Sequence, residues 1–285
     1  MNRLFTTFRY TFKSLRGQTL GWGLGLALYG LMSVSMYDSM AAQQETLQQM
    51  IASYPEEFLA FFGGDADSLI TPAGFLGMYA FSMMPVIIGI FAVLAGSGLI
   101  ASDEERGRLD LIMSHPVGRT AFFFGRVLGV LAACLAIMLL GWIGFSLMLG
   151  SSSLGFTWGE MLVPFLSLFA QTLVYVALGL LLSMLLPSRS LAAMLTGLLL
   201  VTSYFVSSLS FMDERLAALA KLMPYHYFQT ALSFAELNPG WLFGLLGSSL
   251  LMALLAWLRF LRRDIRLSGE GSWRLPFPSK RRRAA

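Results

Sequence analysis

The sequence predicts an all-α polytopic membrane protein with six transmembrane helices, and two observations carry this prediction. First, 56% of the 285 residues are hydrophobic and only 13% are charged, whereas soluble chains carry about 25% charged residues. Second, six runs lack Asp, Glu, Lys and Arg, and each is long enough for a bilayer-crossing helix of about 20 residues. A transmembrane barrel would instead need alternating segments of about ten residues, which are absent. The six runs are 17–37, 68–102, 127–159, 161–188, 190–212 and 237–258.

The elements expected from these runs form a single membrane domain, 1–285, because the linkers are short and no internal repeat is found. The first run is expected to be retained as a helix, since "SVSMYDSM" lacks the small-residue cleavage pattern of a signal peptide. A kink is expected at Pro85 in the second helix. The expected transmembrane helices are 19–37, 73–101, 126–149, 161–186, 191–211 and 241–260.

The segments outside the bilayer also have expected structures. Residues 1–16 should form a separate amphipathic helix on the membrane surface, because four apolar residues recur on one face, with an unstructured basic leader as the alternative. A short cytoplasmic helix is expected between the second and third transmembrane helices, and helical outer excursions before the second and the sixth. Residues 261–285 are a basic tail. The apolar face of 1–16 consists of Phe5, Phe8, Phe12 and Leu15.

The positions of the basic residues predict the orientation. If six helices alternate across the membrane, all of the 20 Lys and Arg except Arg215 and Lys221 fall on one side. By the positive-inside rule that side is the cytoplasm, so both termini and the segment 102–119 are expected there, in the inner or plasma membrane of a prokaryote. The tail "SKRRRAA" is interpreted as an anchor on anionic lipid rather than a nucleic-acid site.

Several kinds of chemistry are disfavoured. His115 and His226 are expected on opposite sides of the membrane, so they cannot share a metal, and the single cysteine, Cys134, is interpreted as a packing residue. No Gly-x-x-x-x-Gly-Lys-Ser/Thr loop is present to hold ATP. The run "EERGR" resembles the glutamate signature of intramembrane CAAX-type proteases, but it is one residue too short and no histidine lies in an expected helix. We therefore expect neither an enzyme nor a cofactor in this chain.

Transport without a partner is also disfavoured. None of the expected helices has Asp, Glu, Lys or Arg in its interior, whereas ion-coupled carriers usually need such a residue to bind the driving ion. A carrier that uses only carbonyls and hydroxyls, or a channel acting alone, remains the main alternative, followed by a membrane enzyme and a passive scaffold. If the chain carries out energy-requiring transport, the energy must come from a partner.

The segment 102–119 is the candidate contact with that partner. Its acidic start, from Asp103, suits a helix N-terminus, and Leu109, Ile112 and Met113 would form one apolar side of a short helix. An exposed apolar ridge ringed by charges at the membrane surface is a docking element, although a plain polar loop is the alternative. The polar residues around the ridge are Glu104, Glu105, Arg106, Arg108 and Arg119, and Pro116 ends the helix.

This region is similar to that between the second and third helices of type-2 ABC transporter permeases. The resemblance lies in "DEERGRLDLIMSHPVGRTAFFFGRVLG" and extends over nearly the whole chain, to "FLRRDI" after the last helix. Arg108 departs from the more usual Thr, and Arg126 stands where Lys is more common. The residues that fit the family pattern are Glu105, Gly107, Leu109, Pro116, Val117, Arg119 and Arg126.

The resemblance implies a half-transporter. Two permeases, identical or paralogous, would pair with two cytosolic ATPase subunits that hold ATP and magnesium, and the segment would be the coupling helix that contacts them. Export is implied, and the helices suit an amphipathic, lipid-like or drug-like cargo, although the same Met and Phe residues serve equally as packing. The implied coupling residues are Glu104, Glu105, Arg106, Gly107, Arg108, Leu109, Ile112, Met113, Pro116 and Arg119.

Overall fold

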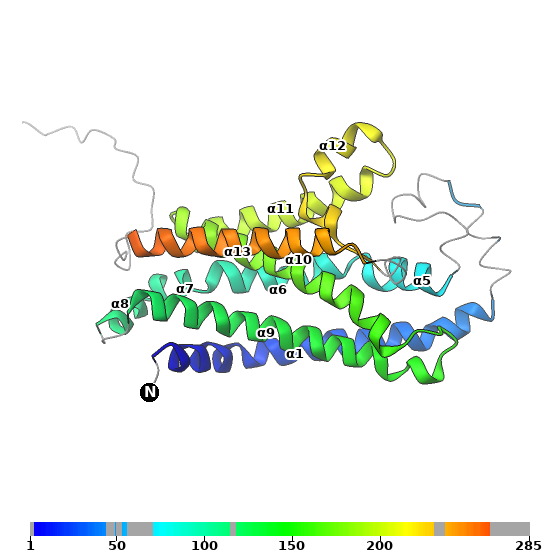
Figure 1. Ribbon diagram of the computed structural model, residues 1–285, viewed down its shortest axis with the longest axis horizontal. Helices are drawn as coiled ribbons and strands as arrows, with labels where there is room; N and C mark the ends of the chain where they lie inside the picture. Colours follow the sequence, from blue (N-terminus) through cyan, green and yellow to red (C-terminus); the bar gives the residue numbers. More distant parts are fainter. Residues whose placement is uncertain are drawn as a thin grey trace, which may run out of the picture.

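The computed structural model describes residues 3–43, 49, 53–55, 71–114, 118–230 and 237–262, which form a bundle of long helices running roughly side by side (Figure 1). Within these residues no strand occurs, and six helical stretches are long and apolar enough to cross a membrane, as predicted. The stretches are α1 (Arg3–Ala41), the series α5 (Pro72–Phe75), η1 (Leu76–Phe81) and α6 (Met84–Gly98), α9 (Arg119–Leu147), α10 (Trp158–Leu185), α11 (Arg189–Leu209) and α13 (Pro239–Arg262).

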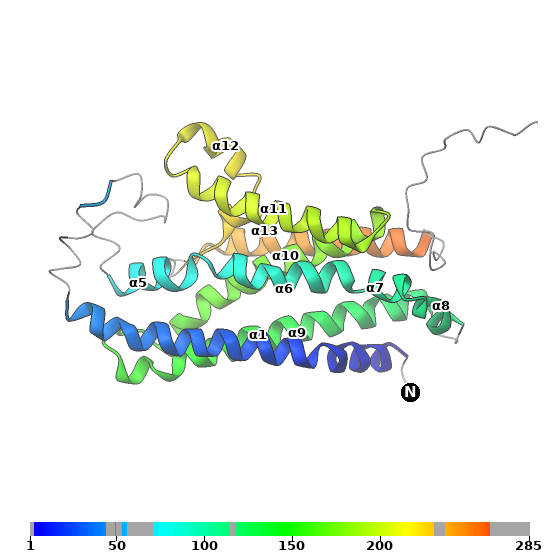
Figure 2. The same cartoon turned by 180° about the vertical axis from the view of Figure 1, so that it is seen from behind.

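Short helices occupy the two ends of the bundle. The helices α7 (Ala101–Glu105) and α8 (Arg108–Met113) lie at the end where α1 begins and α13 finishes, which we call the α8 end (Figure 2). The opposite end, called the α12 end, carries α12 (Ala217–Ala220) between the 3-10 turns η3 (Glu214–Leu216) and η4 (Pro224–Tyr227). A further 3-10 turn, η2 (Leu149–Ser151), follows α9.

The separate surface helix expected for residues 1–16 is wrong, because residues 3–16 are the first part of the continuous helix α1. No proline interrupts the chain there, and α1 runs alongside α9 over its length (Figure 2). Small residues allow the approach: a Cβ added to Gly125 or Gly129 would lie 2.6 Å from the Cβ of Thr7 or Thr11, respectively. Packing against α9 through small residues therefore continues the helix where lipid contact alone was expected.

The expected helix ends differ from the observed ones mainly at α9. It begins at Arg119, well before the expected start at 126, because Gly118 is extended and the helix continues outward past the apolar run. At the start of α10, Thr157 and Glu160 form a capping box, which satisfies two backbone N–H groups. Charge-free runs mark the lipid-compatible stretch, whereas caps mark where the helix itself begins and ends.

The second transmembrane stretch is broken rather than simply kinked. The π-helical turn η1 ends at Phe81, and α6 begins at Met84, just before the expected kink at Pro85. Pro85 has no N–H, and the N–H of Val86 donates to the carbonyl of Met83. The carbonyl of Ser82 instead accepts from the hydroxyl of Tyr225, at 2.7 Å. A residue far along the chain thus compensates for the break.

The core is aromatic, and the edges are open. Phe81, Phe145 and Phe165 form a fully buried cluster whose ring centroids lie 5.2 to 5.7 Å apart. Further along the bundle, α6 and α10 approach so tightly that a Cβ on Gly96 would collide with the carbonyl oxygen of Val176. By contrast, most of the apolar surface of α13 is exposed, which suits a helix at the edge of a bundle in lipid.

Before the last helix, where a helical excursion is expected, the described residues form the short elements η3, α12 and η4, and residues 231–236 lie outside the described residues. The helical excursion expected before the second transmembrane helix lies largely outside the described residues. The described residues also exclude His115, Pro116, Val117 and the tail from residue 263 onward.

Candidate functional site

A tight turn joins α7 to α8 at the end of the bundle. Arg106 leaves the helix with φ −87° and ψ 3°, and Gly107 follows with φ 63°. That left-handed conformation strains residues with a Cβ, which explains a glycine at this position. The N–H of Gly107 donates to the carbonyl of Glu104 at 3.0 Å, closing the turn. The turn reverses the chain so that α8 lies across the end of the bundle.

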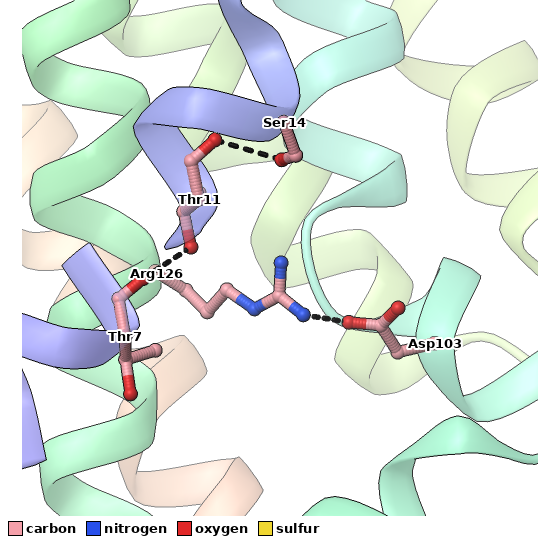
Figure 3. Close-up of polar contacts among 5 residues, drawn as sticks. All are labelled: Thr7, Thr11, Ser14, Asp103 and Arg126. Atoms are coloured by element: carbon pink, nitrogen blue, oxygen red, sulfur yellow. Dashed lines mark hydrogen bonds and ion pairs between the residues drawn. The ribbon is translucent and has the colours of Figure 1, made fainter. Parts of the chain in front are cut away.

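A buried ion pair anchors α7 to α9. The carboxylate of Asp103 accepts from the guanidinium of Arg126, and the two residues are only 7% and 6% exposed (Figure 3). Arg126 also lies against the rings of Tyr10 and Phe122, with its guanidinium carbon 5.4 and 5.1 Å from the ring centroids. Such contacts add cation–π attraction. The pair therefore joins α1, α7 and α9 at one point.

A second contact joins α7 to α11. The carboxylate of Glu105 accepts from the backbone N–H of Arg189 at 3.0 Å, at the first residue of α11. The hydroxyl of Ser188 accepts from the N–H of Leu191 in the same turn. A carboxylate at a helix N-terminus is stabilised by the unsatisfied N–H groups and the helix dipole. Glu105 thus caps α11, although we expected it to face a partner.

A third contact joins the start of α9 to the end of α13. The guanidinium of Arg119 donates to the carbonyl oxygen of Leu261 at 3.2 Å. The last carbonyls of a helix lack partners within the helix, and an arginine can satisfy one of them. Three contacts therefore connect the segment 103–119 with α9, α11 and α13.

The apolar ridge expected on α8 points largely inward, so this prediction is corrected. Leu109 is 2% exposed and belongs to the protein's own core, against which Ile112 and Met113 also pack. Leu111 is instead 68% exposed. The spacing of Leu109, Ile112 and Met113 defines one face of the helix, but spacing does not say whether that face turns toward the bundle or away from it.

The remaining expected site residues divide in a simple way. Arg106 and Arg108 are exposed, Glu104 is half-buried, and Gly107 forms the turn. Sequence reasoning missed the partnership of Asp103 with Arg126, and Arg126 lies inside α9, contrary to the expectation that no charged residue falls within a helix. The sequence placed acidic residues at the first helical junction and Arg126 beyond the second, but nothing in it selected Asp103 from the three consecutive acidic residues 103–105.

A comparison with known protein families identifies the family of this chain. The family described as ABC-2 family transporter protein matches residues 12–265. The chain belongs to this family. No curated protein matches the chain significantly. ABC-2 proteins are the membrane components of ABC transporters and usually pair with ATPase subunits, so the chain is a multi-pass ABC-2 permease.

Proposed function

We propose that this ABC-2 permease is driven by two copies of a separate cytosolic ATPase that bind the surface of α8, and that it works as a pair with a second copy or a paralogue. The observation that carries the proposal is the connection of the α7–α8 segment to α9, α11 and α13 through charged contacts. The α8 end then faces the cytoplasm of a prokaryote, in agreement with the distribution of Lys and Arg.

Through these contacts, ATP binding to the partner would displace helices of the bundle. A partner that binds α8 differently in its ATP-bound and free states would favour one position of α7, because a ligand shifts an equilibrium only by its differential affinity. The Asp103–Arg126 pair would pass that displacement to α9, and Glu105 would pass it to the start of α11. ATP and magnesium belong to the ATPase in this proposal.

The direction of transport and the cargo are proposed from coarser features. We propose export of an amphipathic, lipid-like or drug-like compound, because the bundle offers apolar and aromatic surfaces. One apolar cavity of about 430 Å³ lies between α10, α11, η4 and α13. Its walls include Val174, Leu245 and Met252, together with the aromatic rings of Tyr227 and Trp241.

The test is capture of the ATPase encoded beside this gene by the purified permease. Leu111→Asp places a charge on the exposed face of α8 and should reduce ATPase binding by about tenfold or more, as for a central interface residue. Leu222→Asp is the matched control, because Leu222 is similarly exposed at the α12 end. It should leave binding unchanged.

Two outcomes would contradict the proposal. Binding of the ATPase that is equal for Leu111→Asp and the native chain would remove α8 as the docking surface. Transport on an ion gradient by liposomes that contain only the permease would favour the stand-alone carrier or channel instead.

A further inference from the structure

A cavity of about 260 Å³ lies beside the buried ion pair at the α8 end, between α1, α6, α7, α9 and α11. Arginines from four different elements line it: Arg106 after α7, Arg108 on α8, Arg126 on α9 and Arg189 on α11. A water molecule occupies about 30 Å³ in the liquid. The cavity volume is several times larger, so a phosphate group fits inside it.

The lining carries a clear excess of positive charge. Among the described residues of the lining, Asp103 supplies the single carboxylate, and that group is already paired with Arg126. Glu105 is close by, but its carboxylate accepts from the backbone of Arg189. In the described part of the chain, Nε of the buried Arg126 has no hydrogen-bond partner. The cavity thus lacks the negative charge that would balance its guanidinium groups.

Apart from Leu15 on α1, the aliphatic side chains of the lining come from α6 and the residue that follows it. The hydroxyl of Ser14 and the amide of Gln18 on α1 accompany the arginines, whereas Leu94 and Ala95 of α6, with Leu99 just after it, form an apolar wall. Leu94 belongs to a transmembrane helix and is half exposed. A molecule with an anionic group and an apolar chain could therefore place the anionic group beside the arginines and the chain against the apolar wall.

We propose that this cavity binds the phosphate group of an anionic lipid. Guanidinium groups hold phosphate oxygens through paired, charge-assisted hydrogen bonds. Basic residues at a membrane surface favour anionic headgroups. A phosphate held between Arg106 and Arg189 would connect α7 with α11 beside the existing Glu105 contact. The proposal does not depend on ATPase docking at α8.

The experiment measures lipid binding to the purified permease in neutral detergent, with no ATPase present, by native mass spectrometry. Phosphatidylglycerol should bind more tightly than zwitterionic phosphatidylcholine. Arg106→Gln combined with Arg189→Gln should weaken phosphatidylglycerol binding by about tenfold or more, because the loss of one charge-assisted hydrogen bond to the phosphate is by itself worth about tenfold.

The matched control removes the same charge from the same end of the bundle. Arg9→Gln combined with Arg16→Gln changes two exposed residues of α1 that do not line the cavity, and it should alter binding less than twofold, on the order of a purely long-range effect. The thermal midpoint of each variant verifies folding. If the double variant fails to fold, Arg106→Gln alone gives the same test, because Arg106 is exposed.

Competition identifies the source of the phosphate. If excess inorganic phosphate leaves phosphatidylglycerol bound, the lipid is the ligand as proposed. If inorganic phosphate displaces the lipid completely, the cavity is a site for free phosphate and the lipid assignment is overturned. Equal binding of both lipids, or equal losses in the cavity and control variants, would overturn the site itself.

Discussion

The α7–α8 segment and the η3–η4 segment are both short connections at the ends of the bundle, but they are held in different ways. Charged groups anchor the first, through Asp103, Glu105 and Arg119. Neutral hydrogen bonds anchor the second: Tyr225 and Gln229 reach the backbone or hydroxyls of Ser82, Ser203, Ser167 and Asn238. Loss of one partner in a buried charged contact leaves a charge stranded, whereas loss of a neutral contact leaves one polar group.

The largest effect is expected at the buried ion pair. Arg126→Met should leave the Asp103 carboxylate buried without its partner and lower stability by about 3–5 kcal/mol. Replacing both residues, Arg126→Met with Asp103→Leu, should recover much of the loss, because no charge then remains to be desolvated. Thermal unfolding in detergent measures both. A single variant as stable as the native chain would show that the pair contributes no anchoring.

The two faces of α8 should differ almost as strongly. Leu109→Ala removes a side chain from the core and should cost about 2–5 kcal/mol, as for other buried leucines. Leu111→Ala, two residues away on the exposed side, should change the free energy of unfolding by less than about 0.5 kcal/mol. The same unfolding assay compares the two variants. Similar losses of stability in both would contradict the orientation of α8, with Leu109 inward and Leu111 outward.

The neutral contacts should be weaker. Tyr225→Phe keeps the ring against Tyr204 and Phe228 but removes the donor to the carbonyl of Ser82, and should cost about 1–3 kcal/mol. Tyr227→Phe is the matched control, because its hydroxyl bonds the carbonyl of Lys221 in an exposed position, and it should cost less. Equal midpoints for Tyr225→Phe and the native chain would indicate that another donor replaces the hydroxyl.

The smallest effect is the pH dependence of stability that we expect from His226 in the η3–η4 segment. Partial burial, and then the nearby charge of Lys221, lower the pKa of His226 below its ordinary value of 6.5. The unfolded chain then binds a proton more readily, so stability is complete above pH 6.5 and decreases as pH falls from there through the lowered pKa. His226→Gln should remove this component. The difference in thermal midpoint between variant and native chain, followed across that range, measures it.

The sequence was sufficient for the number and order of transmembrane stretches, because lipid demands long charge-free runs. It was insufficient at Arg3–Arg16, where charge suggested a surface helix but α9 offers the glycines that let α1 continue. The break before Pro85 could be anticipated, whereas its compensation by Tyr225 could not. That contact joins residues far apart in the chain, and no local pattern reveals it.

The candidate site shows the same division. The short helix α8 followed from the spacing of its apolar residues, whereas the turn at Gly107, which separates α8 from α7, was not predicted. The inward direction of Leu109 did not, because an apolar face is equally suited to the bundle and to a partner. Glu105 and Arg119 were expected among charges that face outward, but both satisfy helix ends within the chain. Helix termini need partners, and nearby charged residues in a membrane protein are first candidates for that need.

The length of α1 fixes where these contacts lie relative to the lipid. Its 39 residues give a rod of about 58 Å at 1.5 Å per residue, roughly twice the 30 Å of the hydrocarbon layer. Arg9, Lys13 and Arg16 cannot cheaply enter hydrocarbon, so the first turns of the rod stand at headgroup depth or beyond. Tyr10 lies on those turns and touches Arg126. The length of α1 therefore holds the ion pair near the water-facing boundary of the membrane, where, in the proposed mechanism, a displacement of α8 by the ATPase would reach it.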